Sequence, residues 1–320
     1  MKKDTAKKKL EEYNDVYADI FNGLLFEGEK VLREEYLLSL PTESFTRNMD
    51  GSLRQGNRDI RKADGRGGRY RLILGEENQE KRENTMPQRI MGYEYAAYEE
   101  QIRTLTDKNK TEGIPAVTKR IHDDQKLAPV ITIVLYWGDE EWTRPLHLHD
   151  MLEFPSDIEK QIKPFVADYP VNLIQMTRLS AEVRERFTSD FEILADYFAM
   201  KNEPEKLKEF MKNKRKVIRH TEEFLDVMNT ITGDKRYQQI EKQLIGKIDK
   251  EEVTMCTLLD LCENTGIEKG IQVGIQTGIK TGIQTVAKNM FLRGMSQEDT
   301  AALCGESTEK IREWFEEWSQ

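Results

Sequence analysis

The sequence predicts a mixed α/β fold followed by a helical annex. Short apolar runs bounded by glycine or proline predict buried strands within residues 69–79 and 128–137. Apolar residues spaced by three or four predict helices over 8–38 and 86–106, and beyond residue 181 the patterns are helical throughout. We therefore expect a mixed domain at 1–180, a helical extension at 181–255, and a C-terminal region at 256–320.

Composition excludes several classes of protein. The 320 residues are 38% hydrophobic and 33% charged, which supplies a core and a solvated surface. No run of eighteen apolar residues spans a membrane, and no apolar segment follows the basic N-terminus. The three cysteines form no C-x-x-C pair, so we expect reduced thiols in a cytoplasmic protein. The net charge of −9 argues against a uniformly basic nucleic-acid binder, although residues 54–120 hold 15 basic and 11 acidic side chains.

The helix expected over residues 8–38 carries two acids, Asp15 and Asp19, one turn apart. Either could project toward a metal ion, or both could belong to a solvated face.

Two carboxylates are expected to meet on a hairpin. A short strand at residues 57–61 carries Asp59, a glycine-rich turn follows at 63–68, and a second strand delivers Glu77 and Gln79 near its end. Period two along a strand places Glu77 and Gln79 on one face. Carboxylates on adjacent strands are suited to an oxygen-liganded divalent metal.

Later elements are predicted less sharply. Pro87 fits the first turn of the helix at 86–106. The run at 128–137 predicts a central strand, and 170–176 a further one. Helices are expected at about 184–200, 204–217, 220–231 and 236–247. His147 and His149 lack a third ligand at motif spacing, which favours hydrogen bonding over metal binding.

A repeat of five Gly-Ile pairs at period four fills residues 266–283. Five glycines inside a helix cost roughly 5 kcal/mol relative to alanine. Packing against a counterpart helix in a second chain would offset that cost, giving a homo-oligomer; a loose linker is the alternative. The short helices that follow resemble a helix-turn-helix, with Ser296 and Ser307 as caps. The last helix is acidic, which favours a packing module over a DNA reader.

Taken together, these segments resemble the PD-(D/E)XK nuclease superfamily, and within it the transposase-like, recombination-promoting nucleases. The resemblance rests on Asp59 followed by Glu77-Asn-Gln79, and on segments along the whole chain: 17–19, 58–60, 75–79, 86–93, 130–137, 146–151 and the Gly-Ile repeat. It implies a restriction-endonuclease-like αβββαβ core.

The resemblance also implies metal-dependent hydrolysis of DNA. Asp59 and Glu77 would hold Mg²⁺, with Mn²⁺ as a substitute, aided by the Asn78 carbonyl and by Asp19 as an outer acid. Gln79, which stands where the superfamily usually has Lys, would orient the attacking water. Because glutamine carries no charge, either slow chemistry or a stand-in cation is expected. Lys62, Lys81 and Arg89 are the nearest candidates for that cation. Together with Arg58 they are also the candidates for contact with DNA phosphates.

Two functions therefore remain open. One is a Mg²⁺-dependent DNA endonuclease of the recombination-promoting type. The other is a DNA-binding or assembly protein that keeps the nuclease fold without useful catalysis.

Overall fold

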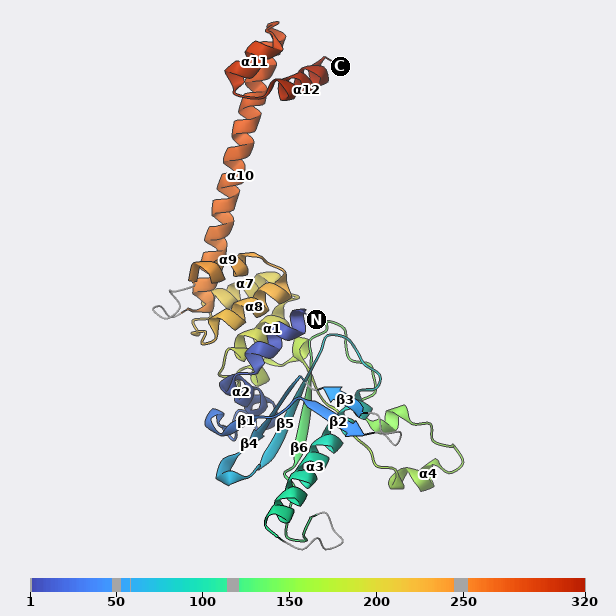
Figure 1. The fold of residues 1–320 in the computed structure, drawn as a ribbon. Coiled ribbons are helices and arrows are strands. Elements are labelled where there is room, and N and C mark those ends of the chain that lie inside the picture. The colour runs from blue at the N-terminus through green and yellow to red at the C-terminus, as the bar shows by residue number, and fades with distance from the viewer. Residues whose placement is uncertain (1, 48–52, 58, 114–120, 245–252, 320) are drawn as a thin grey trace. The chain divides into compact units, whose positions relative to one another are not determined.

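The computed structural model describes residues 2–47, 53–57, 59–113, 121–244 and 253–319. The chain forms two compact units, Met1–Cys256 and Thr257–Gln320, and each is described by itself. The first unit is built around a sheet with helices on both faces (Figure 1).

The central sheet has five strands in the order β1-β4-β5-β6-β7. They are β1 (Leu37–Ser39), β4 (Ile60–Asp64), β5 (Leu72–Gln79), β6 (Val130–Tyr136) and β7 (Asn172–Gln175). β1, β4 and β5 are antiparallel, whereas β6 and β7 run parallel to β5. A separate hairpin, β2 (Glu43–Arg47) with β3 (Leu53–Asn57), lies between β1 and β4 in the chain.

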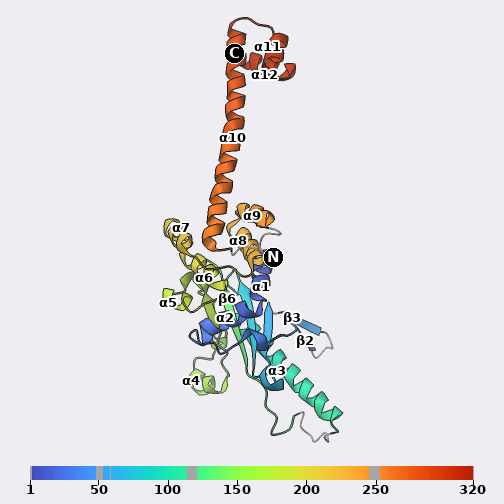
Figure 2. The ribbon, with the colours of Figure 1, turned by 90° about the vertical axis from the view of Figure 1, so that its left-hand side faces the viewer.

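Helix α3 (Met86–Thr111) covers one face of this sheet, as the side view shows (Figure 2). Its apolar stripe buries Ile90 and Tyr93 against Val134 and Tyr136 of β6. Farther along the helix, Ala97 packs with Ile73 of β5 in a second cluster. Residues 73, 75, 77 and 79 of β5 therefore face α3, because alternate residues of a strand share a face.

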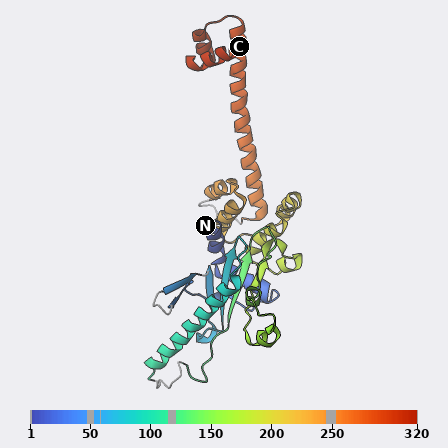
Figure 3. The ribbon, with the colours of Figure 1, turned by 90° about the vertical axis from the view of Figure 1, so that its right-hand side faces the viewer.

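Helices α1 (Lys2–Glu11) and α2 (Asn14–Leu25) lie on the opposite face (Figure 3). Lys62 Nζ of β4 donates to the Glu12 carbonyl, and it also donates to Asn14 Oδ1 at 2.6 Å. The prediction of a single helix over residues 8–38 is thus wrong. Tyr13 is extended at φ −66° and ψ 135°, and the chain leaves the second helix through Glu27 and Gly28 at positive φ. Lys62 donates to the Glu12 carbonyl, which is exposed by the break between the two helices.

In chain order the core consists of helices, three antiparallel strands, a helix and a parallel strand. This confirms the predicted mixed α/β fold with an αβββαβ core. The predicted turn between β4 and β5 is also present, with Gly67 and Gly68 at φ values of 74° and 76°. Those values favour glycine.

The other regular elements described in the first unit are helices and short 3₁₀ turns. Its α-helices are α4 (Glu159–Ile162), α5 (Ala181–Arg184), α6 (Phe191–Met200), α7 (Pro204–Asn213), α8 (Thr221–Thr232) and α9 (Arg236–Leu244). Single 3₁₀ turns occur at Glu34–Tyr36, Arg66–Gly68, Leu148–Met151, Lys163–Phe165 and Met176–Arg178. Phe191 and Phe198 of α6 pack edge-on against Trp137, which follows β6.

The second unit contains most of α10 (Met255–Leu292), then α11 (Gln297–Cys304) and α12 (Thr308–Trp318). The Gly-Ile repeat lies wholly inside α10. Ser296 and Ser307 cap the two short helices, as predicted, by accepting the N–H groups of Asp299 and Lys310. A small core joins these helices to the end of α10: Ala287, Ala301, Ile311, Trp314 and Phe315.

Candidate functional site

The end of β5 carries four consecutive polar residues, and its neighbours bring further acids beside them. β4 pairs Ile60 with Glu76 of β5, so Asp59, which precedes β4, lies beside the end of that strand. The strand alternation sends Glu77 and Gln79 toward α3, and Glu76 and Asn78 toward α1. Two polar clusters result, one on each face of the sheet.

On the α3 face, Glu77 is the centre of a charged group. Its Oε1 accepts hydrogen bonds from Gln79 Nε2 at 3.0 Å and from the Arg89 guanidinium, which also donates to the Tyr93 hydroxyl at 3.0 Å. Glu77 and Tyr93 are buried, but Gln79 and Arg89 remain partly exposed. Glu77 thus lies just beneath the surface.

Asp59 lies at the rim of the same group. Its Oδ2 accepts the backbone N–H of Asn78 at 2.7 Å, and the residue is partly exposed. Burial raises the pKa of Tyr93, and the negative charges of Glu77 and then Asp59 raise it further. Asp59 is thus fixed beside the end of β5 by its bond to the Asn78 backbone.

The α1 face holds a fully buried acid pair, Glu11 and Glu76, each with no exposed surface. Asn78 Nδ2 donates to Glu11 Oε2 at 2.6 Å, and its Oδ1 accepts from Trp137. Glu11 Oε1 and Glu76 Oε2 have no hydrogen-bond donor among the described residues. The carboxyl groups of Glu11 and Glu76 can hydrogen bond to each other only if one of the two carries a proton.

Burial disfavours the charged forms of both acids of this pair and raises both pKa values. Burial raises the pKa of Glu76 well above its ordinary value, and the charges of Glu11 and Asp59 raise it further. Burial also raises the pKa of Glu11, although the hydrogen bond to Glu76 and the charge of Lys7 lower it. Lys7 is itself buried over the Trp137 ring and paired with Glu80.

The structure brings three predicted residues into contact, Glu77, Gln79 and Arg89, and it holds Asp59 on the backbone of Asn78, next to Glu77 in the chain. It places Lys62 beneath α2 on the other face, where burial lowers its pKa. Lys81 lies on the exposed surface two residues beyond Gln79. Arg58 lies outside the described residues.

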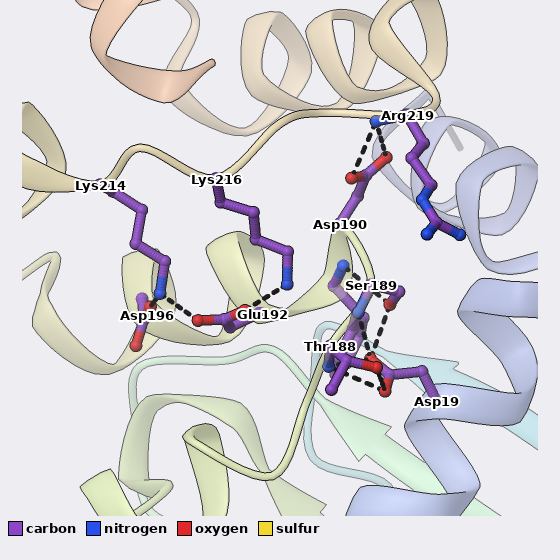
Figure 4. Close-up of polar contacts among 10 residues, drawn as sticks. Asp19, Thr188, Ser189, Asp190, Glu192, Asp196, Lys214, Lys216 and Arg219 are labelled. Carbon is purple, nitrogen blue, oxygen red and sulfur yellow. Dashed lines mark hydrogen bonds and ion pairs between the residues drawn. The ribbon is translucent and has the colours of Figure 1, made fainter. Parts of the chain in front are cut away.

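Asp19, expected as an outer metal ligand, is engaged elsewhere. Its carboxylate accepts both the N–H and the hydroxyl of Thr188 and of Ser189, at 2.7–2.8 Å (Figure 4). These bonds fix the segment between α5 and α6, and they explain why one helix over 184–200 was a wrong prediction. Asp19 is 7% exposed. Its four donors indicate a structural role.

Charged groups around α6 continue this scaffold. Asp190 accepts the backbone N–H groups of Arg219 and His220, and Lys214 lies between Glu192 and Asp196 (Figure 4).

His147 Nδ1 pairs with Asp168 at 2.7 Å, and His149 Nε2 with the Val166 carbonyl at 2.8 Å. The expected hydrogen-bonding role of these two histidines is confirmed.

The donor set at the rim is suited to a hard cation of low protein coordination. Across the described part of the chain, no three His, Cys, Asp or Glu side chains form a metal-binding group. Mg²⁺ needs fewer, because it is commonly held by one or two carboxylates together with waters and substrate phosphates. Asp59 and Glu77 supply two such carboxylates beside a partly exposed edge.

Sequence reasoning missed Glu11, Glu76 and Lys7. The spacing Lys7-x-x-x-Glu11 places both on one side of a helix, which was an available signal. Glu76 was hidden because β5 is buried on both faces, so its apolar run has no alternation that reveals the strand phase.

The fold and this acidic strand end define the class: a mixed-sheet α/β protein with carboxylates at the start of β4 and the end of the central strand β5. Residues 38–223 match the family model described as "Putative transposase, YhgA-like", and the chain belongs to this family. The match covers the central sheet, α3 and both partners of the Asp59–Glu77 edge. No curated protein and no solved structure gives a significant match.

Proposed function

We propose that the protein is a Mg²⁺-dependent DNA endonuclease that acts in recombination, with its site at the Asp59–Glu77 edge. The observation that carries this proposal is the grouping of Glu77, Gln79 and Arg89 at a partly exposed rim beside Asp59. The membership in a transposase family supports it. Among the described helices none is long and apolar enough to cross a membrane.

Each residue has a role that its chemistry allows. Asp59 and Glu77 would hold the cation, which when bound supplies Lewis acidity toward a phosphodiester oxygen. Gln79 would orient a water through its amide. Arg89 would take the role of the missing lysine, because its guanidinium forms an ion pair with Glu77 and stays charged at every relevant pH. A cation there stabilises negative charge that develops on phosphate.

The α1-side pair is less suited to this role. Glu11 and Glu76 have no exposed surface, so a DNA phosphate cannot approach them without displacing α1. We assign them instead to holding Asn78, whose backbone N–H positions Asp59.

DNA cleavage tests the proposal directly. Supercoiled plasmid is incubated with the full chain in Mg²⁺, in Mn²⁺ and in EDTA. We expect nicking with either cation, none in EDTA, and at least a hundredfold slower reaction for Asp59→Asn, on the order expected when a catalytic charge is lost. The exposed Asp157→Asn is the matched control and should cleave normally.

The second candidate function is a DNA-binding or assembly protein with the same fold. The glutamine at residue 79 favours it, because the usual lysine is absent. Tight DNA binding without cleavage in either cation would support this alternative and contradict the nuclease.

A further inference from the structure

A cavity of about 540 Å³ lies beside α2 in the first unit. Its volume falls within the range of about 300–1,000 Å³ that is typical of small-ligand sites. Three segments that are far apart in the chain line it together with α2: residues 28–35, residues 186–189 and Arg219. Asp59 and Glu77 are not among the lining residues, so this cavity is distinct from the proposed nuclease site.

One face of α2 anchors these three segments. Asp15, Asp19 and Asn22 follow one another by four and three residues, a spacing that places them on the same side of a helix. Asp15 pairs with Nε2 of His220 at 2.9 Å, which fixes the segment just before α8. Asp19 accepts hydrogen bonds from residues 188 and 189, which fixes the segment between α5 and α6.

Asn22 holds the third segment. Its Nδ2 donates to the Leu32 carbonyl at 3.0 Å and its Oδ1 accepts the Leu32 N–H at 2.9 Å, and both residues are buried. Gly28 has a φ of +87°, and a Cβ at that residue would lie 3.3 Å from the Cβ of Arg186. Two of the three segments thus pack closely on each other, and the walls of the cavity are formed without a ligand.

Each anchored segment brings positive charge to the cavity. The lining cations are Lys30 and Arg33 of the first segment, Arg186 of the second, and Arg219. Lys30 and Arg33 are exposed and form no ion pair with any residue that the structure describes. Arg186 pairs at 3.0 Å with Glu182, whose side chain is 82% exposed, so water screens that pair.

Arg219 combines a fixed backbone with an open side chain. Its N–H donates to the buried carboxylate of Asp190 at 3.1 Å, and its side chain extends toward α2 with 71% of its surface exposed (Figure 4). Its guanidinium nitrogen lies 3.7 Å from Asp15 Oδ2, which exceeds hydrogen-bond distance. The guanidinium therefore keeps donors for a ligand.

Four acids also line the cavity. Asp15 and Asp19 direct their oxygens at protein donors. Glu34 and Glu35 are exposed, where water and salt screen their charge. An anion that enters the cavity thus finds the remaining hydrogen-bond donors on its cations.

We propose that this cavity binds a phosphorylated ligand of about the size of a nucleotide. Three of its four cations are arginines, whose planar guanidinium groups match the oxygens of phosphate in bidentate fashion. The volume also leaves room for a sugar and a base beside the phosphate. A free nucleotide and the phosphorylated end of a DNA strand present this same chemistry. Binding here does not depend on cleavage at the nuclease site.

Titration calorimetry of the full chain in EDTA tests the ligand class. The probes are deoxyadenosine 5′-monophosphate, deoxyadenosine, and one short DNA strand with and without its 5′-phosphate. We expect the monophosphate to bind at least about tenfold more tightly than the nucleoside, because charge-assisted hydrogen bonds are lost with the phosphate. A strand that binds more tightly with its 5′-phosphate assigns the ligand to DNA, whereas a strand indifferent to it assigns the ligand to free nucleotides. Equal binding of monophosphate and nucleoside, or no binding of either, would overturn the proposal.

Two substitutions test the location of the site. Arg219→Gln and Arg33→Gln each remove one exposed lining cation, and each should weaken binding of the monophosphate about tenfold. Arg103→Gln removes an equally exposed arginine from α3 and should bind like the wild type. Circular dichroism checks that all three chains are folded. Unchanged binding in both lining variants would overturn the site, whereas binding without any plasmid nicking would support it and contradict only the nuclease.

Discussion

Replacing Asp19 tests whether its carboxylate has a structural role or a metal-binding role. Asp19→Ala removes the acceptor of four donors on Thr188 and Ser189, two of them backbone N–H groups. A buried donor left without an acceptor costs about 1–3 kcal/mol, which is the loss expected from the N–H of buried Ser189. Thr188 is exposed, so its N–H can bond to water and adds less. The two hydroxyls can rotate toward other partners and add less.

Urea unfolding followed by circular dichroism measures this loss. We expect the midpoint of Asp19→Ala to fall by the same amount in EDTA and in Mg²⁺, because the carboxylate contacts protein donors only. Glu29→Gln, an exposed acid near the end of α2, is the control and should unfold like the wild type. Unchanged stability in EDTA, with a loss seen only in Mg²⁺, would refute the structural role and restore Asp19 as a metal ligand.

Three further predictions concern the strand end. Since burial raises the pKa of Glu76 above its ordinary value of 4.5, its contribution to stability is present below that value and is lost as pH rises through the folded pKa. Glu76→Gln should therefore gain stability over wild type between pH 4 and neutral pH, in urea unfolding with EDTA; a constant difference would contradict this. Arg89→Gln should slow plasmid nicking about a hundredfold, against normal rates for Arg82→Gln. Gln79→Lys should preserve or raise the rate, and a fall to the Arg89→Gln level would show that the amide has a specific role.

The core of the fold could be predicted because its signals are local. The β6 run is apolar and β-branched over its whole length, and the glycines at 67 and 68 mark a turn that other residues enter only with strain. The pairing of Glu77 with Gln79 also followed from period two alone. These inferences needed no knowledge of what packs on either face.

Other features depend on tertiary contacts that a local pattern does not contain. Asp19 was expected at the metal because it lies on the first helical segment, yet its donors come from residues 188 and 189, far along the chain. The break at Tyr13 depends on Lys62 of β4. Glu11 and Glu76 meet only because α1 crosses the end of β5.

The central claim, that the nuclease site lies on the α3 side of β5, is tested most directly by two adjacent substitutions. Glu77→Gln and Glu76→Gln make the same chemical change on opposite faces of one strand. Their plasmid-nicking rates are compared in Mg²⁺, after circular dichroism shows both chains folded. We predict that Glu77→Gln abolishes cleavage while Glu76→Gln keeps it. Cleavage lost in Glu76→Gln and kept in Glu77→Gln would place the site on the α1 face and contradict this account.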